Sequence, residues 1–303
     1  MVIDMHTHVA DLRGPAIMDR TPVTFESLIA RLDDEGIDKA VLLPFGVNAE
    51  ERPFAFLFGD RADPISQIRE GMRYEERLIL FGNVDPRMGG NQATTDFSWV
   101  FERFVQMGCV GIGEVTANLE ADDARVVNFF RQCGAWHLPV TIHGNAIGAG
   151  SYGLTDLPGS PHLERLLQQV PETIILGHGP GFWAEIAAGL TLEDKAGYPK
   201  GPITAEGSLW RLMRAYPNLC CDMSAGSGHN ALTRDPAQGI RFLNEFQDRI
   251  VFATDVCFSD ARGRMPHLAT LRRLLAEGSI TQSVFDKLTY QNALRILTRY
   301  TTS

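Results

Sequence analysis

The chain has 303 residues, of which 44% are hydrophobic and 21% are charged, as in an ordinary globular protein. Its formal net charge of −9 argues against a surface that binds nucleic acid or an anionic membrane. The five cysteines are an odd number without a C-x-x-C pair, which favours a reduced, cytoplasmic protein. We expect neither a signal peptide nor a transmembrane helix, because the N-terminus lacks a basic and apolar leader and no uncharged apolar run reaches about 18 residues.

The first predicted element is a strand over Val2–Asp4, which leads directly into His6-Thr7-His8. Side chains alternate along a strand, so His6 and His8 would point to the same side and their imidazoles would converge. A neutral imidazole is a good ligand for Zn, Mn, Fe or Ni. A His-x-His pair also arises by chance, so the rest of the chain decides its meaning.

Strand-like and helix-like segments alternate along the remaining sequence. Further strands are predicted over Lys39–Leu43, Ile79–Asp85, Val110–Glu114, Val140–His143, Thr173–Leu176, Leu219–Asp222 and Ile250–Ala253. Helices are predicted over Thr24–Asp34, Asp96–Met107, Asp122–Trp136, Ser160–Gln169, Ala205–Tyr216 and Pro236–Phe246. Residues 266–303 hold one or two more helices.

This alternation predicts an α/β protein with a parallel sheet and helical crossovers. Eight strands favour a closed (β/α)8 TIM barrel, slightly distorted, with a C-terminal helical cap, and we expect residues 1–303 to form a single domain. An open doubly wound sheet is the alternative, but it would not bring the ends of five strands to one point. Residues 48–63 and 185–206 read as long loops on the catalytic face, and Pro53–Phe58 would form either core packing or a pocket lid.

Four later predicted strands each end in a side chain that can bind a metal. These side chains are Glu114, His143, His178 and Asp255. Taken singly, each has a structural interpretation, such as a helix N-cap for Asp255 or an arginine partner for Glu114. Together with His6 and His8 they form a nitrogen and oxygen set for a divalent metal at the carboxyl ends of the strands, where barrel enzymes carry their active sites.

In this order, the six residues resemble the metal ligands of the amidohydrolase superfamily of barrels, and above all its amidohydrolase-related branch. The resemblance covers essentially the whole chain. It implies that His6 and His8 bind a buried metal and that Asp255 is both a further ligand and a proton-transfer group. It also implies a small-molecule substrate and, as is common in the family, a possible homodimer.

The remaining three positions leave the number of metal ions open. The resemblance implies that His143 is a ligand, and that His178 either binds a second metal or stays free and polarises the substrate carbonyl. Glu114 stands where binuclear members often have a carboxylated lysine. It could bridge two ions, or it could orient a histidine instead. We expect one or two divalent ions, zinc first, with Mn, Fe or Ni as alternatives.

The favoured function is a metal-dependent hydrolase that activates water to cleave a C–N or C–O bond in a small amide, ester or lactone. Asp255 would transfer the proton, and His178, if free, would stabilise the oxyanion. One alternative is a nonoxidative decarboxylase, for which Arg262 or Arg264 could hold the substrate carboxylate. A non-catalytic binding barrel is the other, and the intact set of six residues argues against it.

Two further residues have open interpretations. His229 follows the strand Leu219–Asp222 and is either a substrate contact or a surface histidine. Cys257 lies two residues past Asp255, and an inert packed thiol is favoured over a pocket residue because no histidine-paired nucleophile pattern surrounds it.

Overall fold

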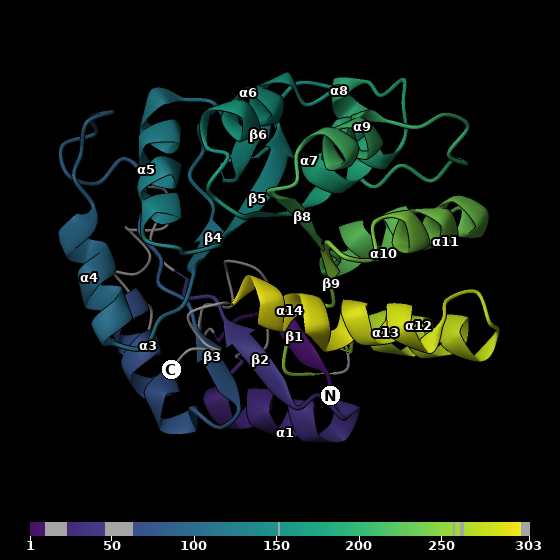
Figure 1. The fold of residues 1–303 in the computed structure, drawn as a ribbon, viewed down its shortest axis with the longest axis horizontal. Helices are drawn as coiled ribbons and strands as arrows, with labels where there is room; N and C mark the ends of the chain where they lie inside the picture. Colours follow the sequence, from purple (N-terminus) through teal and green to yellow (C-terminus); the bar gives the residue numbers. More distant parts are fainter. Residues whose placement is uncertain (10–22, 46–62, 151, 257, 261–263, 298–303) are drawn as a thin grey trace.

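Parallel strands form the centre of the molecule in the computed structural model, which describes residues 1–9, 23–45, 63–150, 152–256, 258–260 and 264–297 (Figure 1). In chain order they are β1 (Ile3–Thr7), β2 (Lys39–Leu42), β3 (Leu78–Leu80), β4 (Ile112–Val115), β5 (Val140–Ala146), β7 (Ile175–His178), β8 (Leu219–Asp222) and β9 (Ile250–Val251). Each corresponds to one predicted strand, and all but β8 have shifted ends. A further short strand, β6 (Leu154–Asp156), pairs with the end of β5 and was not predicted.

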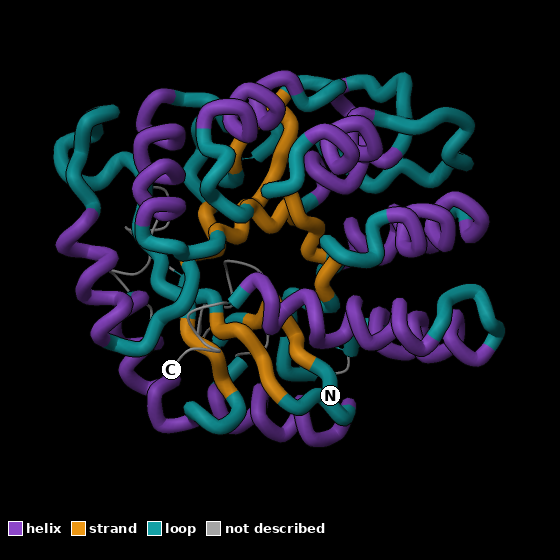
Figure 2. Tube along the Cα trace, in the orientation of Figure 1, coloured by secondary structure: helices purple, strands orange, loops and turns teal. Residues whose placement is uncertain are grey.

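The strands close into a barrel, which confirms the predicted fold class. β1, β2 and β3 form one parallel sheet, and β4, β5, β7, β8 and β9 form another. Isolated parallel bridges join the two sheets on both sides, between Gly82 and Ile112 and between Thr7 and Val256. Figure 2 shows the two groups of strands facing one another, with the helices outside.

Helices cover the outside of the barrel, and all six predicted ones are confirmed with small shifts at their ends. They are α1 (Phe25–Glu35), α4 (Ser98–Gln106), α5 (Ala124–Ala135), α6 (Pro161–Gln169), α9 (Ser208–Ala215) and α11 (Pro236–Glu245). Thr24, the first residue of the predicted helix, is the N-cap of α1, because its side chain accepts a hydrogen bond from the Ser27 backbone N–H. None of the described helices is long and apolar enough to cross a membrane.

Further helical segments lie outside the predicted helix ranges. They are α3 (Pro64–Gly71), η1 (Met72–Tyr74), α7 (Pro180–Trp183), η2 (Ala184–Ile186), α8 (Leu192–Lys195) and α10 (Ala225–Thr233). The predicted loop over residues 185–206 therefore contains the end of η2 and all of α8. Of the predicted loop over residues 48–63, only Asp63 is among the described residues, and it caps α3.

The C-terminal segment closes one end of the barrel, as the predicted helical cap requires. It comprises α12 (His267–Ala276), α13 (Gln282–Asp286), the π-helical η4 (Lys287–Gln291) and α14 (Asn292–Ile296). Ala293, Ile296 and Leu297 pack into the same buried cluster as Ile3 and Met5 of β1. This interior cluster is separate from the larger apolar layer between the strands and the outer helices. The cap thus seals the amino-terminal end and leaves the carboxyl ends of the strands for the site.

Candidate metal centre

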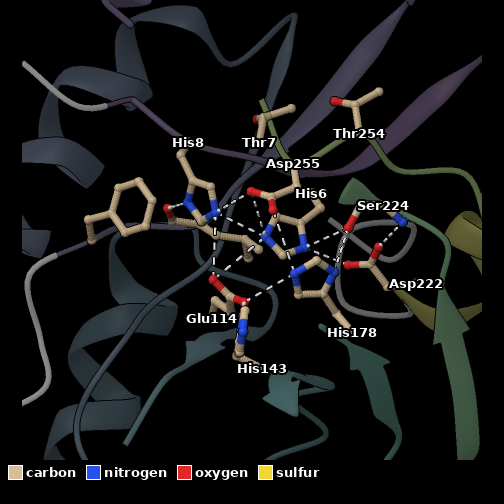
Figure 3. Close-up of polar contacts among 12 residues, drawn as sticks. His6, Thr7, His8, Glu114, His143, His178, Asp222, Ser224, Thr254 and Asp255 are labelled. Carbon is tan, nitrogen blue, oxygen red and sulfur yellow. Dashed lines mark hydrogen bonds and ion pairs between the residues drawn. The ribbon is translucent and has the colours of Figure 1, made fainter. Parts of the chain in front are cut away.

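His6 and His8 point at one another at the carboxyl end of β1 (Figure 3). Their Nε2 atoms lie 2.9 Å apart, and both side chains are almost completely buried. The prediction that the two residues face the same side is confirmed. Simple alternation would have turned both histidines away from the barrel interior, because Met5 already packs inside the barrel. The register of β1 on β2 shifts between Asp4 and Thr7, and this irregularity brings His6 to the centre as well.

The far nitrogens of both rings are held by oxygen atoms. His8 Nδ1 lies 2.8 Å from the Leu43 carbonyl oxygen, which can only accept a hydrogen bond, so His8 carries its proton on Nδ1. His6 Nδ1 lies 2.6 Å from Asp222 Oδ2. Burial opposes the ionised form of Asp222, but His6 outweighs it and lowers the pKa of this carboxyl, so His6 also donates from Nδ1.

Both Nε2 atoms therefore carry lone pairs that face each other. Two lone pairs at 2.9 Å repel unless a cation or a proton lies between them. The pKa of His6 is consistent with a positive charge at this place. Burial alone would lower this pKa, but Asp222 and Asp255 raise it well above the ordinary histidine value. The donor set thus fits a divalent metal on its own geometry.

Two carboxylates complete this side of the centre. Glu114 Oε2 lies 3.7 Å from the Nε2 atoms of both His6 and His8. Asp255 Oδ1 lies 3.7 Å from His6 Nε2 and 3.3 Å from His8 Nε2. Burial favours the neutral form of both acids, but the neighbouring histidines outweigh it and hold both pKa values below the usual range. The Asp255 side chain is 17% exposed against 7% for Glu114, so Asp255 is the more open of the two.

His178 reaches the centre from the end of β7. Its Nε2 lies 3.5 Å from Glu114 Oε1 and 3.6 Å from Asp255 Oδ2, and its Nδ1 lies 2.7 Å from the Ser224 hydroxyl. Burial and the neighbouring His6 lower the pKa of His178 to about 4. At neutral pH, His178 is therefore an uncharged imidazole that can act as a ligand or a hydrogen-bond donor.

His143 contacts the centre through Glu114. Its Nδ1 lies 2.7 Å from Glu114 Oε1, while its buried Nε2 has no hydrogen-bond partner among the described residues. The structure thus brings all six predicted side chains together at the ends of five strands. Whether His143 itself binds a metal stays a prediction.

Comparison with known proteins identifies the family. A family model described as "Amidohydrolase" matches residues 3–299, nearly the whole chain. The chain belongs to the amidohydrolase family. It is an enzyme of a metal-dependent family, and its buried His and Glu cluster is a candidate site for a divalent metal.

Solved structures share the fold of this amidohydrolase at low sequence identity. A zinc-bound amidohydrolase from Burkholderia multivorans is 14% identical with a TM-score of 0.58, over 98% of this chain and 99% of its own. A probable 2-pyrone-4,6-dicarboxylic acid hydrolase from Acinetobacter baumannii is 16% identical with a TM-score of 0.58 and the same coverage. The 5-carboxyvanillate decarboxylase from Sphingomonas paucimobilis is 16% identical with a TM-score of 0.60, over 98% of each chain. No curated protein matches the sequence significantly.

Several residues of the amidohydrolase centre were not predicted. Asp222 is hydrogen-bonded to His6, and Ser224 is hydrogen-bonded to His178. The Phe45 ring stacks on His8 with centroids 3.9 Å apart. Asn83 donates hydrogen bonds to the backbone oxygens of Pro44 and Glu114. Asp222 ends a strand just as the predicted ligands do, so the sequence pattern could have found it. The other three lie beyond strand ends and have no such signal.

Other predicted candidates lie away from the amidohydrolase centre or outside the described residues. His229 is half-buried, lies 3.2 Å from the Thr270 hydroxyl and packs against the His267 ring. Arg264 is exposed and forms an ion pair with Asp34 at 2.6 Å. Cys257 and Arg262 lie outside the described residues.

Proposed function

We propose that the protein is a zinc-dependent hydrolase that cleaves a C–N or C–O bond in a small amide, ester or lactone. The pair of Nε2 lone pairs at 2.9 Å, flanked by two ionised carboxylates, is the observation that carries this proposal. Imidazole and carboxylate ligands with an open position are typical of catalytic zinc sites. The zinc in the Burkholderia multivorans amidohydrolase supports the choice of metal.

A divalent metal at this centre supplies a Lewis acid and lowers the pKa of the water that it binds to about 7. Asp255 is the group that moves the proton in our proposal. Its carboxylate is ionised and is the more exposed of the two, so it can accept a proton from the attacking water. Asp255 then returns this proton to the leaving oxygen or nitrogen, and the carboxylate is restored.

His178 binds the substrate oxygen in the same proposal. Its uncharged ring points Nε2 toward the space between Glu114 and Asp255. A proton on Nε2 would be donated to the substrate carbonyl oxygen as negative charge develops there. The buried site keeps bulk water from competing for this hydrogen bond.

We propose one zinc ion rather than two. The two Glu114 oxygens face different histidines, because Oε2 lies toward His6 and His8 and Oε1 toward His143 and His178. A carboxylate whose two oxygens face different histidines could bridge two metal ions. However, Oε1 and His143 Nδ1 are already at the hydrogen-bond distance of 2.7 Å, which supports a Glu114 that orients His143 beside a single ion.

Nonoxidative decarboxylation is the second candidate, and the structural similarity to 5-carboxyvanillate decarboxylase favours it. We rank it below hydrolysis because a substrate carboxylate needs a cationic partner. One of the two arginines predicted for that role, Arg264, is paired with Asp34 at the surface.

The test is a parallel assay of zinc-loaded protein on esters, lactones and amides and on hydroxybenzoic acids. We expect hydrolysis of at least one substrate of the first group, with loss of turnover in Asp255→Asn at unchanged fold. Carbon dioxide release from the second group, without hydrolysis of the first, would establish the decarboxylase instead. Loaded protein that is inactive on both groups would contradict the proposal.

A further inference from the structure

The four histidine rings of the centre differ in what faces their Nδ1 atoms. Three of them face an atom that only accepts a hydrogen bond: the Asp222 carboxylate for His6, the Leu43 carbonyl for His8 and the Glu114 carboxylate for His143. An obligate acceptor fixes the ring proton on Nδ1 and leaves a lone pair on Nε2. His178 Nδ1 faces the Ser224 hydroxyl, which can donate or accept.

Ser224 occupies a position where a serine hydroxyl normally accepts a hydrogen bond from the backbone of its own helix. It is the N-cap residue of α10 with an extended backbone, and such a serine usually accepts a hydrogen bond from the first turn. Ser224 makes no capping bond of this kind. Its completely buried side chain instead lies 2.7 Å from His178 Nδ1 and 3.4 Å from His6 Nδ1 (Figure 3). The hydroxyl is therefore directed at the centre and not at its own helix.

Backbone hydrogen bonds fix the place of this hydroxyl. The Ser224 N–H donates to Asp222 Oδ1 at 2.9 Å, and the next residue, Ala225, donates to the Thr254 carbonyl oxygen at 3.2 Å. His267 Nε2 lies 3.0 Å from the Ala225 carbonyl oxygen. The turn is thus tied to residues at the ends of β8 and β9, the strands that lead to Asp222 and Asp255.

A single hydroxyl proton has two acceptors within reach. Asp222 is the second acceptor beside the hydroxyl, because its Oδ1 already accepts the Ser224 N–H, and Ser224 contributes to the low pKa of this carboxyl. When the hydroxyl donates to Asp222, its oxygen accepts the proton on His178 Nδ1, and Nε2 carries a lone pair. When the hydroxyl donates to His178 Nδ1, the ring carries its proton on Nε2 instead.

We propose that Ser224 is a positioning residue that gives His178, alone among the four rings, access to both tautomers. The Nε2–H tautomer is the one that can donate to a substrate oxygen, so Ser224 makes His178 a proton-handling group and not a fixed metal ligand. The catalytic role of Ser224 rests on the proposed hydrolase function. The tautomer pattern itself can be measured without turnover.

Nitrogen-15 NMR of histidine-labelled, zinc-loaded protein reads the tautomers directly. We expect Nδ1–H signals with coordinated or unprotonated Nε2 for His6, His8 and His143, and averaged nitrogen shifts for His178. Ser224→Ala should move His178 fully to the Nε2–H tautomer, because Nδ1 loses its partner while Glu114 and Asp255 still face Nε2. Ser224→Thr keeps the hydroxyl and should restore the averaged signal.

Ser227→Ala is the matched control, because Ser227 lies on the same helix and its buried hydroxyl has no hydrogen-bond partner among the residues that the structure describes. We expect this variant to leave the His178 signals unchanged. Ser224→Ala should leave the bound zinc unchanged, because the Nδ1 partners of His6 and His8 stay in place.

Two results would overturn the proposal. The first is a fixed Nδ1–H tautomer with zinc-coordinated Nε2 for His178 that Ser224→Ala does not change. The second is a loss of bound zinc in Ser224→Ala as large as in His8→Ala, which would make Ser224 a support of the metal site. A wild-type protein without hydrolase activity but with the expected tautomers would refute the proposed function alone.

Discussion

The Nε2 atoms of His6 and His8 lie 2.9 Å apart, and each ring gives its Nδ1 proton to an oxygen on its far side. Neither ring can therefore donate to the other while both are neutral. The metal-free protein resolves this conflict by binding an extra proton, since the pKa of His6 is raised well above its usual value. Metal and proton compete for the same space between the two rings.

This competition predicts that zinc binding releases a proton. Because the pKa of His6 is raised, its extra proton is present at pH 7 in the metal-free protein, and zinc must displace it. We expect about one proton released per zinc and an affinity that rises with pH up to the pKa of His6. Calorimetric titration in two buffers of different ionisation enthalpy measures this, and identical enthalpies in both would be inconsistent with it.

Asp222 should control metal affinity without touching the metal. Asp222→Asn leaves the shape of the side chain but removes the charge that fixes the His6 tautomer. We expect zinc affinity to fall about 10- to 100-fold. Asp156→Asn is a suitable control, because Asp156 is also buried but accepts hydrogen bonds from the backbone at the start of α6. The control should lose stability and keep its zinc affinity, and equal affinity in both variants would refute the role of Asp222.

The extent to which the centre was predictable follows from where its residues lie. His143, His178 and Asp255 each follow a β-branched strand, so strand pattern and barrel topology together place them at one point. The register shift in β1 had no sequence signal, because it depends on how Asp4 and Thr7 pair with β2. The three-residue strand β6 is too short for a periodic pattern.

The residues that hold the ligands were harder to infer. Ser224 stands at the N-cap position of α10, which lies outside the predicted helix ranges, and only the three-dimensional packing shows its hydroxyl turned toward His178. The Phe45 ring stacks on His8, and its backbone is held on both sides by the Gln67 side chain from α3, a helix that was not predicted. Such contacts depend on rotamers and on elements distant in sequence.

Gly153 should affect the centre through His143. A Cβ at Gly153 would lie 2.8 Å from His143 Cδ2, whereas a Cβ at Gly159 would have no atom within 4 Å from any described residue other than its chain neighbours. Both glycines have left-handed backbones, with φ of 94° and 90°, so alanine should cost each about 1–2 kcal/mol of stability. Gly153→Ala should in addition displace His143 and lower activity. Zinc-loaded Gly153→Ala and Gly159→Ala of equal activity would contradict the contact between His143 and Glu114 as a functional one.

A buried ion pair outside the centre should carry local stability. Lys195 Nζ lies 2.7 Å from Glu185 Oε1, and both side chains are almost fully buried. Lys195→Met leaves the Glu185 charge without its partner and should cost about 3–5 kcal/mol in denaturant unfolding. The double variant Lys195→Met with Glu185→Leu should recover part of this loss. A single variant as stable as the wild type would show that the pair is not coupled.

Metal content is the most direct test of the account. Elemental analysis of protein purified without chelator should give about one zinc, or a similar divalent ion, per chain. The double variant His6→Ala with His8→Ala should give a value near zero at an unchanged circular dichroism spectrum. A wild-type protein that holds no metal, even after incubation with zinc, would contradict the central claim that the two facing lone pairs form a metal site.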